Sequence, residues 1–241
     1  MSKRTTKSIK LALQGGGSHG AFTWGVLDRL LEDERLDIAA VSGTSAGAMN
    51  AVALADGMAR GGPAEARKSL EKFWSATSAA AQYSPIRRSL FDIFMGNWSL
   101  DASPGYVLMD HLSRLFSPYD LNPMNFNPLR DVVAACVDFD HVNDPSGLKL
   151  SLTATNVRTA KPKIFRQPAI GLDSIMASAC LPFLFKAVKI DREACWDGGY
   201  MGNPALFPLV DECDVGDIVV TRSTRFTALI FRDRPATSRT G

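Results

Sequence analysis

The sequence is poor in the residues that build metal sites and disulfide frameworks. It has only four cysteines and three histidines in 241 residues: Cys136, Cys180, Cys195, Cys213, His19, His111 and His141. No two cysteines form a C-x-x-C pair and the histidines are scattered, so no metal site has ligand spacing in the sequence. Four cysteines are also too few to brace a chain of this length, and we expect free thiols in a reducing compartment.

An excess of one charge sign is also missing. The 27 basic and 25 acidic residues leave a net charge of +2, which argues against a nucleic-acid partner. A local basic surface that meets a membrane or an acidic partner is still compatible with this balance.

Long apolar runs are absent as well. The basic N-terminus precedes only the short run 9–13, which is too short for the core of a signal peptide. The uncharged stretch 38–55 has about the length of a membrane span, but it is full of Ser, Thr, Gly and Asn. We therefore expect a soluble, cytoplasmic chain whose membrane contact, if any, is peripheral.

What is present indicates an α/β domain. The composition, with 46% hydrophobic and 22% charged residues, is that of a globular protein. Apolar runs at 9–13 and 38–41 predict buried strands, and the spacing of apolar residues in 21–31 and 46–58 predicts helices. Strand, helix, strand and helix in this order predict a βαβ unit with a parallel sheet.

The rest of the chain is interpreted more coarsely. We expect helices at 63–81 and 172–179 and strands at 131–137, 148–155, 187–190 and 217–221. Residues 1–8 form a basic leader and residues 9–221 one domain, in which the proline-rich and aromatic segment 82–128 is an insertion or lid. Residues 222–241 form an arginine-rich tail without periodicity, which we expect to be poorly ordered.

The first candidate for chemistry is the loop Gly15-Gly16-Gly17-Ser18-His19-Gly20, between a predicted strand and a predicted helix. It fits G-x-G-x-x-G and presents backbone N–H groups at a helix N-terminus, where negative charge is favoured. It could be a dinucleotide site, an oxyanion hole or a plain tight turn. A dinucleotide site requires an acidic residue at the end of the second strand, and none stands there.

That second strand ends instead in Gly43-Thr44-Ser45-Ala46-Gly47. A G-x-S-x-G sequence between a strand and a helix is typical of a nucleophile elbow, a sharp turn that projects the serine away from the sheet. Side chains two residues before and after the serine would collide, so glycine is used at both places. Ser45 is therefore the candidate nucleophile, with a structural serine turn as the alternative.

The base that would activate Ser45 is less obvious. No histidine follows Asp197, and the number of strands before the elbow does not fit the Ser-acid-His order of α/β-hydrolases. His111 and His141 are interpreted as structural, although a triad ending at His141 stays open. The aspartate of Trp196-Asp197-Gly198-Gly199 is another candidate, or else part of a simple turn. Partial burial would raise its pKa and make it a better proton acceptor.

The sequences GGGSHG, GTSAG and DGG, in this order, resemble the patatin-like phospholipase family over residues 9 to about 221. The stretch ASACLPFLF before the aspartate is also similar. The resemblance implies a three-layer α/β/α fold with a mainly parallel central sheet and a Ser-Asp dyad. Carried over by motif, it implies Ser45 as nucleophile, Asp197 as proton acceptor and the amides of Gly15, Gly16 and Gly17 as oxyanion hole. The remaining glycines of the motifs are Gly20, Gly43, Gly47, Gly198 and Gly199.

The implied activity is hydrolysis of lipid acyl esters, of phospholipase A type or less specific, without a metal or cofactor. The alternatives are a nucleotide-binding protein and a catalytically silent α/β protein. His19 stands where the family usually has Arg or Lys, and the chain stops soon after Thr221 where members often continue with helices, so a truncated C-terminus is expected. Apolar residues of the segment 83–126 are candidates for an acyl pocket, a membrane-facing lid or core: Phe91, Ile93, Phe94, Met95, Trp98, Tyr106, Leu108 and Met109.

Overall fold

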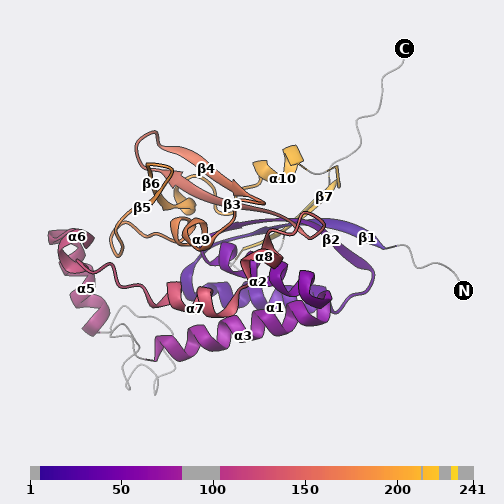
Figure 1. Cartoon of the computed structure of the whole chain (residues 1–241), viewed down its shortest axis with the longest axis horizontal. Coiled ribbons are helices and arrows are strands. Elements are labelled where there is room, and N and C mark those ends of the chain that lie inside the picture. The colour runs from indigo at the N-terminus through magenta and orange to yellow at the C-terminus, as the bar shows by residue number, and fades with distance from the viewer. Residues whose placement is uncertain (1–5, 83–103, 213, 223–228, 233–241) are drawn as a thin grey trace, which may run out of the picture.

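The strands of the protein form one mixed sheet. The computed structural model describes residues 6–82, 104–212, 214–222 and 229–232. The described strands are β1 (Lys7–Leu13), β2 (Leu36–Thr44), β3 (Lys149–Asn156), β4 (Lys161–Arg166), β5 (Val188–Ile190), β6 (Glu193–Asp197), β7 (Asp217–Thr221) and β8 (Leu229–Arg232). Their order is β5-β6-β3-β2-β1-β7-β8, with β4 also paired to β3 (Figure 1).

The centre of this sheet is parallel and its edges are antiparallel. Strands β3, β2, β1 and β7 run parallel, whereas β4 and β6 on β3, β5 on β6 and β8 on β7 are antiparallel. The predicted parallel sheet is thus confirmed for the central strands.

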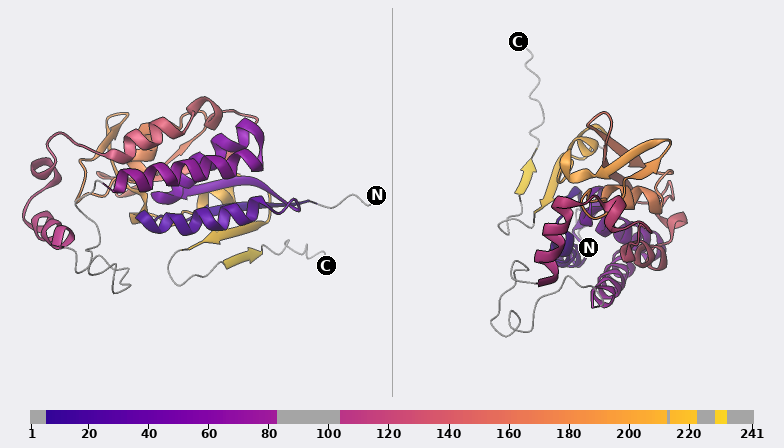
Figure 2. Two further views of the ribbon diagram at one scale, coloured as in Figure 1. Left: turned by 90° about the horizontal axis from the view of Figure 1, so that it is seen from below. Right: turned by 90° about the vertical axis from the view of Figure 1, so that its left-hand side faces the viewer.

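Helices cover both faces of the sheet, but unequally. The described helices are α1 (Gly20–Leu31), α2 (Ala46–Gly61), α3 (Pro63–Ala81), α5 (Pro104–Leu115), α6 (Pro118–Leu121), α7 (Pro128–Cys136), α8 (Phe139–Val142), α9 (Leu172–Ser178) and α10 (Phe207–Glu212), with short 3-10 turns at Gly17–His19 and Gly198–Tyr200. Helices α1, α2 and α3 lie together against one face (Figure 2, left), and α10 lies on the other (Figure 1). The predicted three-layer α/β/α architecture is confirmed, and its thin layer contains the short α10.

The side-chain alternation of β1 explains the two layers. Leu11 and Leu13 point into the large core shared with the helices. Ala12 points the other way, into a small cluster with Leu209 of α10 and Ile218 of β7. A strand with apolar residues on both faces must be covered on both sides, and α10 provides the second cover.

The alanine-rich α2 is the central helix because its residues are small. All residues from Ala46 to Gly57 are buried. A Cβ atom added at Gly57 would lie 2.4 Å from the Cα atom of Ala66 in α3, so the two helices touch backbone to backbone. A helix that is apolar on every side is buried on every side, and α2 is held between the sheet and α3.

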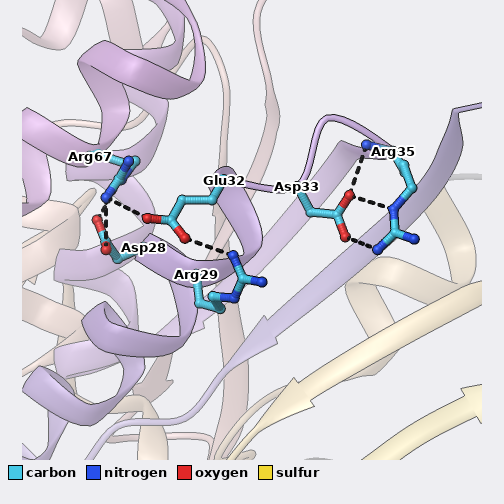
Figure 3. A network of polar contacts seen from close by, with 6 residues as sticks. All are labelled: Asp28, Arg29, Glu32, Asp33, Arg35 and Arg67. Carbon is cyan, nitrogen blue, oxygen red and sulfur yellow. Dashed lines mark hydrogen bonds and ion pairs between the residues drawn. The ribbon is translucent and has the colours of Figure 1, made fainter.

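Ion pairs on the outer surface fix how α3 lies beside α1 (Figure 3). The Arg67 guanidinium contacts Asp28 at 2.7 Å and Glu32 at 2.9 Å, and its hydrogen bonds to Asp28 lower the pKa of that carboxyl. These side chains are partly exposed, and exposed ion pairs contribute little to stability. We interpret the network as orienting the helix pair.

The prediction of a strand at 131–137 is wrong, because α7 occupies this segment. The valines there favoured a strand, but the helix start signals prevail: Asn127 caps the helix by accepting a hydrogen bond from the amide of Leu129, and Pro128 is its first residue. Val133 and Cys136 are the buried residues, and a spacing of three belongs to a helix.

Two other segments differ from expectation or lie outside the description. Within the tail, residues 229–232 pair with β7 as β8, where no regular structure was predicted. Of the apolar candidates in the lid, Phe91, Ile93, Phe94, Met95 and Trp98 lie outside the described residues, as do the side chains of Tyr106 and Met109, while Leu108 on α5 is exposed. Among the helices that the structure describes, none combines the length and the apolar run needed to span a bilayer.

Candidate active site

Ser45 occupies the turn between β2 and α2 in a backbone conformation that a non-glycine residue rarely adopts, with φ 54° and ψ −121°. The glycines around it are required by close backbone contacts. A Cβ atom at Gly43 would lie 2.6 Å from the oxygen of Gly47, and one at Gly47 would lie 2.1 Å from the oxygen of Leu13. The turn is therefore sharp and strained, as a nucleophile elbow is.

The first glycine loop lies directly against this turn. A Cβ atom at Gly15 would be 2.6 Å from the Cβ atom of Ser45, and one at Gly20 would be 2.8 Å from that of Ala46. Parallel pairing of β1 with β2 brings the two loops together, because Leu13 and Gly43 are register partners. The loop and the serine thus share the carboxyl-terminal edge of the central strands.

The backbone amides of this loop differ in their availability. The amide of Gly15 is buried and donates a hydrogen bond to Asn203 Oδ1 at 2.6 Å. Gly16 and Gly17 are exposed, and neither amide has a hydrogen-bond partner among the described residues. Gly16 has φ 159° and Gly17 has φ 57°, and the left-handed conformation of Gly17 turns the chain into α1.

Asp197 reaches the same edge through the pairing of β3. Thr44 of β2 is the register partner of Thr153 in β3, and the next β3 residue, Ala154, is the partner of Asp197 in β6. Ser45 follows Thr44 directly, so the strand order places the serine and the aspartate on neighbouring positions of the sheet edge.

Backbone contacts fix the aspartate in place. Its amide donates to the oxygen of Cys180 at 2.8 Å, and its own carbonyl oxygen accepts from the Thr155 hydroxyl at 2.8 Å. Its Oδ1 accepts a 2.7 Å hydrogen bond from the amide of Gly199. Gly198 must be glycine, since a Cβ atom there would be 2.0 Å from the oxygen of Thr153.

Burial dominates the electrostatics of the Asp197 carboxyl. Its side chain is 5% exposed, and burial raises the pKa of the carboxyl, opposed by hydrogen bonding from the Gly199 amide and from the Ser45 hydroxyl. Oδ2 has no hydrogen-bond partner among the described residues, although the Ser45 hydroxyl is near enough to act on the pKa of the carboxyl. Catalytic hydrogen bonds are often long before substrate binds.

The other titratable candidates contact different partners. Nδ1 of each histidine lies within 3.1 Å of an oxygen: Gly16 O for His19, Val107 O for His111 and Asp56 Oδ1 for His141. No hydrogen bond joins any of them to Ser45 among the described residues. Cys136, Cys180 and Cys195 are buried and free, while Cys213 lies outside the described residues. Burial raises the pKa of the Cys180 thiol to about 11, so it is protonated at neutral pH. No group of three or more His, Cys, Asp or Glu side chains within the described ranges could hold a metal ion.

Two residues that contact the site were not singled out from the sequence. Asn203 holds the amide of Gly15. Ser178, the last residue of α9, accepts a 2.9 Å hydrogen bond from the amide of Ser45. Ser178 lies in the ASACLPFLF stretch and Asn203 soon after the DGG sequence, and these neighbouring motifs were the signals that could have found them.

Comparison with known proteins gives one family match. The sequence model of the patatin-like phospholipases matches residues 11–210, and a search of curated proteins finds no match. VipD from Legionella pneumophila is similar in structure with 16% identity and a TM-score of 0.42, over 81% of this chain and 46% of that one. A chain of the ExoU–SpcU complex from the type III secretion system of Pseudomonas aeruginosa has 22% identity and a TM-score of 0.36, over 74% and 36%. The chain therefore spans less than half the length of these two structures.

Proposed function

Since the chain belongs to the patatin-like phospholipase family, we propose that it hydrolyses acyl esters of lipids, with Ser45 as nucleophile and Asp197 as proton acceptor. In the first step the Ser45 hydroxyl proton passes to Oδ2 of Asp197 while Oγ bonds to the ester carbonyl carbon. The tetrahedral intermediate then expels the alcohol, which takes the proton from Asp197. Water repeats the sequence on the acyl-serine and releases a carboxylic acid.

The backbone amides of Gly16 and Gly17 are the proposed donors to the oxyanion. They follow β1 and come just before α1, so the partial positive charge of the helix N-terminus adds to theirs. The amide of Gly15 already donates to Asn203, so it would join the oxyanion hole only after that bond breaks. Each oxyanion donor is worth about 10²–10³-fold in rate, and a positioned proton acceptor about 10²–10⁴-fold.

The observation that supports this most is that a strained backbone at Ser45 lies beside a buried oxygen of Asp197 that lacks a hydrogen-bond partner among the described residues. Ser45 has a strained backbone that glycine contacts enforce, and the neighbouring Asp197 has a buried Oδ2 that receives no hydrogen bond from the part of the chain that the structure describes. A buried acceptor left without a partner costs about 1–3 kcal/mol. A proton arriving from Ser45 would satisfy that oxygen, which is what a general base requires.

The test is covalent labelling with a fluorophosphonate, together with hydrolysis of a soluble p-nitrophenyl ester. The full chain should be labelled at Ser45, and Ser45→Ala should lose both labelling and hydrolysis while its circular dichroism is unchanged. Ser18→Ala is the matched control, because Ser18 is an exposed serine of the adjacent glycine loop. Labelling that persists in Ser45→Ala would contradict the assignment of Ser45 as the nucleophile, and wild-type protein that is not labelled would favour a catalytically silent protein.

A further inference from the structure

Ser178 connects the turn that carries Ser45 to β3, the strand whose pairing with β6 places Asp197. Its side chain is fully buried. Its Oγ accepts a 2.9 Å hydrogen bond from the amide of Ser45 and donates a 2.6 Å hydrogen bond to the oxygen of Thr153. One hydroxyl thus connects β3 to the strained turn.

The carbonyl of Thr153 is also where the aspartate side of the site is anchored. Gly198 lies so close to this oxygen that no other residue would fit, and the next residue of β3 is the register partner of Asp197. The Ser178 hydroxyl therefore fixes the distance between the backbone of Ser45 and the backbone that carries the aspartate.

We propose that Ser178 is a positioning residue for acyl transfer, which holds Ser45 within reach of Asp197; this rests on the proposed function. Without the hydroxyl, the amide of Ser45 loses its acceptor and the turn can relax away from φ 54°. A misplacement of about 1 Å is enough to cost roughly 100-fold in rate. Substrate contacts are not altered, so the loss should be in kcat and not in KM.

The test compares Ser178→Ala with Ser174→Ala. Ser174 lies one turn earlier in α9 and is also buried, and its Oγ accepts from the amide of Gly171 at 3.1 Å; among the described residues it forms no hydrogen bond to the Ser45 turn. Ser178→Ala should lower kcat and the rate of fluorophosphonate labelling by about 10- to 100-fold with KM unchanged, whereas Ser174→Ala should change only the melting temperature. Ser178→Cys, which keeps the volume with weaker hydrogen bonds, should fall between wild type and Ser178→Ala.

The pH profile separates positioning from a purely structural role. Burial raises the pKa of Asp197, and hydrogen bonding from the Gly199 amide and the Ser45 hydroxyl opposes that rise, so a displaced Ser45 should move the acidic limb of kcat/KM to higher pH. An unshifted profile, or a kcat of Ser178→Ala that matches Ser174→Ala, would overturn the proposal. Because wild-type labelling is measured first, failure of the proposed function would be recognised separately.

A second inference comes from the exposed apolar side chains of residues 115–126. Five of them, which we call the 115–126 surface, project into solvent: Leu115, Phe116, Tyr119, Met124 and Phe126. Met124 is 90% exposed and Phe126 69%. Single exposed apolar residues are ordinary, but a cluster within one short segment marks an interaction site.

Polar contacts hold this segment in shape with its apolar side chains outward. Asn122 accepts a 2.7 Å hydrogen bond from the amide of Phe126 and donates one of 3.0 Å to its carbonyl oxygen. Lys186 donates to the oxygen of Pro123 at 2.6 Å and lies 5.5 Å from the ring centre of Tyr119. Since Lys186 follows α9 by a short turn, the surface adjoins the helix whose Ser178 contacts Ser45.

We infer that the 115–126 surface meets the interface of a phospholipid bilayer, which again rests on the proposed function. Aromatic and methionine side chains, together with a lysine whose ammonium group lies over the Tyr119 ring, are the chemistry that the headgroup boundary accepts. In Figures 1 and 2, α5 and α6 stand out from the sheet and its helical layers. A surface lying flat on lipid there would bring the ester substrate to the side of the molecule that carries α9.

The experiment uses the Ser45→Ala chain, so that vesicles are not hydrolysed. Its binding to sonicated phosphatidylcholine vesicles, with and without phosphatidylglycerol, is measured by flotation. The double variant Met124→Ser/Phe126→Ser should partition about tenfold or more weakly, while Val210→Ser, which replaces a 59% exposed residue of α10 far from α5 and α6 (Figure 1), should bind normally. In chains that keep Ser45, the double variant should hydrolyse soluble ester at the wild-type rate.

Three results would overturn this inference. The first is no binding to either kind of vesicle, and the second is equal binding of the double variant and its parent. The third is a parent chain that sediments as a dimer while the double variant sediments as a monomer, which would make a second copy of the chain the occupant of the surface. Soluble-ester hydrolysis tests the proposed function independently of all three.

Discussion

Replacing Asp197 by asparagine should make the protein more stable and less active at once. The carboxylate is buried, and its Oδ2 has no partner among the described residues. An unsatisfied buried acceptor costs about 1–3 kcal/mol, and more when it is charged. Asparagine is neutral, keeps an oxygen for the Gly199 amide, and can turn an N–H group toward the Ser45 oxygen. We expect the free energy of unfolding to rise by about 1–3 kcal/mol, with roughly 2–4 °C in melting temperature for each kcal/mol in a chain of this size.

The pH dependence of this difference has a definite sign. Burial raises the pKa of Asp197 above its ordinary value of 3.8. Below that ordinary value the carboxyl is protonated in both the folded and the unfolded chain, so burial carries no ionic penalty. As the pH rises through the folded-state pKa, the unfolded chain ionises more readily and the wild type loses stability. The advantage of Asp197→Asn should therefore be largest at neutral pH and shrink as the pH falls toward about 4.

The assay is urea unfolding of wild type and variant at pH 7 and pH 4, with hydrolysis of a soluble ester measured on the same preparations. Asp28→Asn is the control of opposite sign, because hydrogen bonding to Arg67 lowers the pKa of Asp28; it should cost a little stability at neutral pH and no activity. If Asp197→Asn is less stable than wild type at pH 7, or retains the full rate, the assignment of a desolvated base is refuted.

Four further substitutions probe the turn and two positions away from it. Gly47→Ala, whose Cβ atom would lie 2.1 Å from the oxygen of Leu13, should lower the free energy of unfolding by about 3 kcal/mol or more through overpacking. Gly25→Ala in α1, where a Cβ atom meets nothing within 4 Å, should raise it by about 0.5–1 kcal/mol. Urea unfolding of the two variants beside wild type measures both changes. Ser45→Gly should add about 1 kcal/mol by relieving the strain at φ 54°, and a lower melting temperature would argue against strain. His141→Gln should leave ester hydrolysis unchanged, and a large loss of kcat would revive a triad with histidine.

The three glycine motifs could be found from the sequence because their residue spacing and their places between strands and helices are local. Gly43 and Gly47 flank the serine by two residues on either side. The collision avoided at Gly43 is with the oxygen of Gly47 in the same turn, and the one avoided at Gly47 is with the oxygen of Leu13 at the end of β1. The order of strands and helices around them then predicts that parallel pairing brings Gly15 and Ser45 together. These steps use steric contacts and chain connectivity, both of which a sequence displays.

Other parts of the site depend on contacts between distant segments, which no local pattern encodes. Ser178 contacts Ser45 across 133 residues, and Asn203 contacts Gly15 across 188. The hydrogen bond of Asn203 also removes the Gly15 amide from the set of open donors, which motif reasoning alone counts as available. The helix α7 is a different case, because its start signals are local: the cap at Asn127 and the buried helical face outweigh the preference of its valines for a strand.

The dimensions of the site follow from the register of β3 more than from any side-chain contact. This strand is parallel to β2 and antiparallel to β6, so a slip of one residue against β6 would turn Asp197 to the other face of the sheet. Gly198 opposes such a slip, since a residue with a side chain at its position would collide with the oxygen of Thr153. The same oxygen accepts the Ser178 hydroxyl that holds the amide of Ser45. Because one carbonyl group carries both restraints, changes on either side of it should alter the distance between serine and aspartate before they unfold the sheet, and activity should be more sensitive than stability to substitutions there.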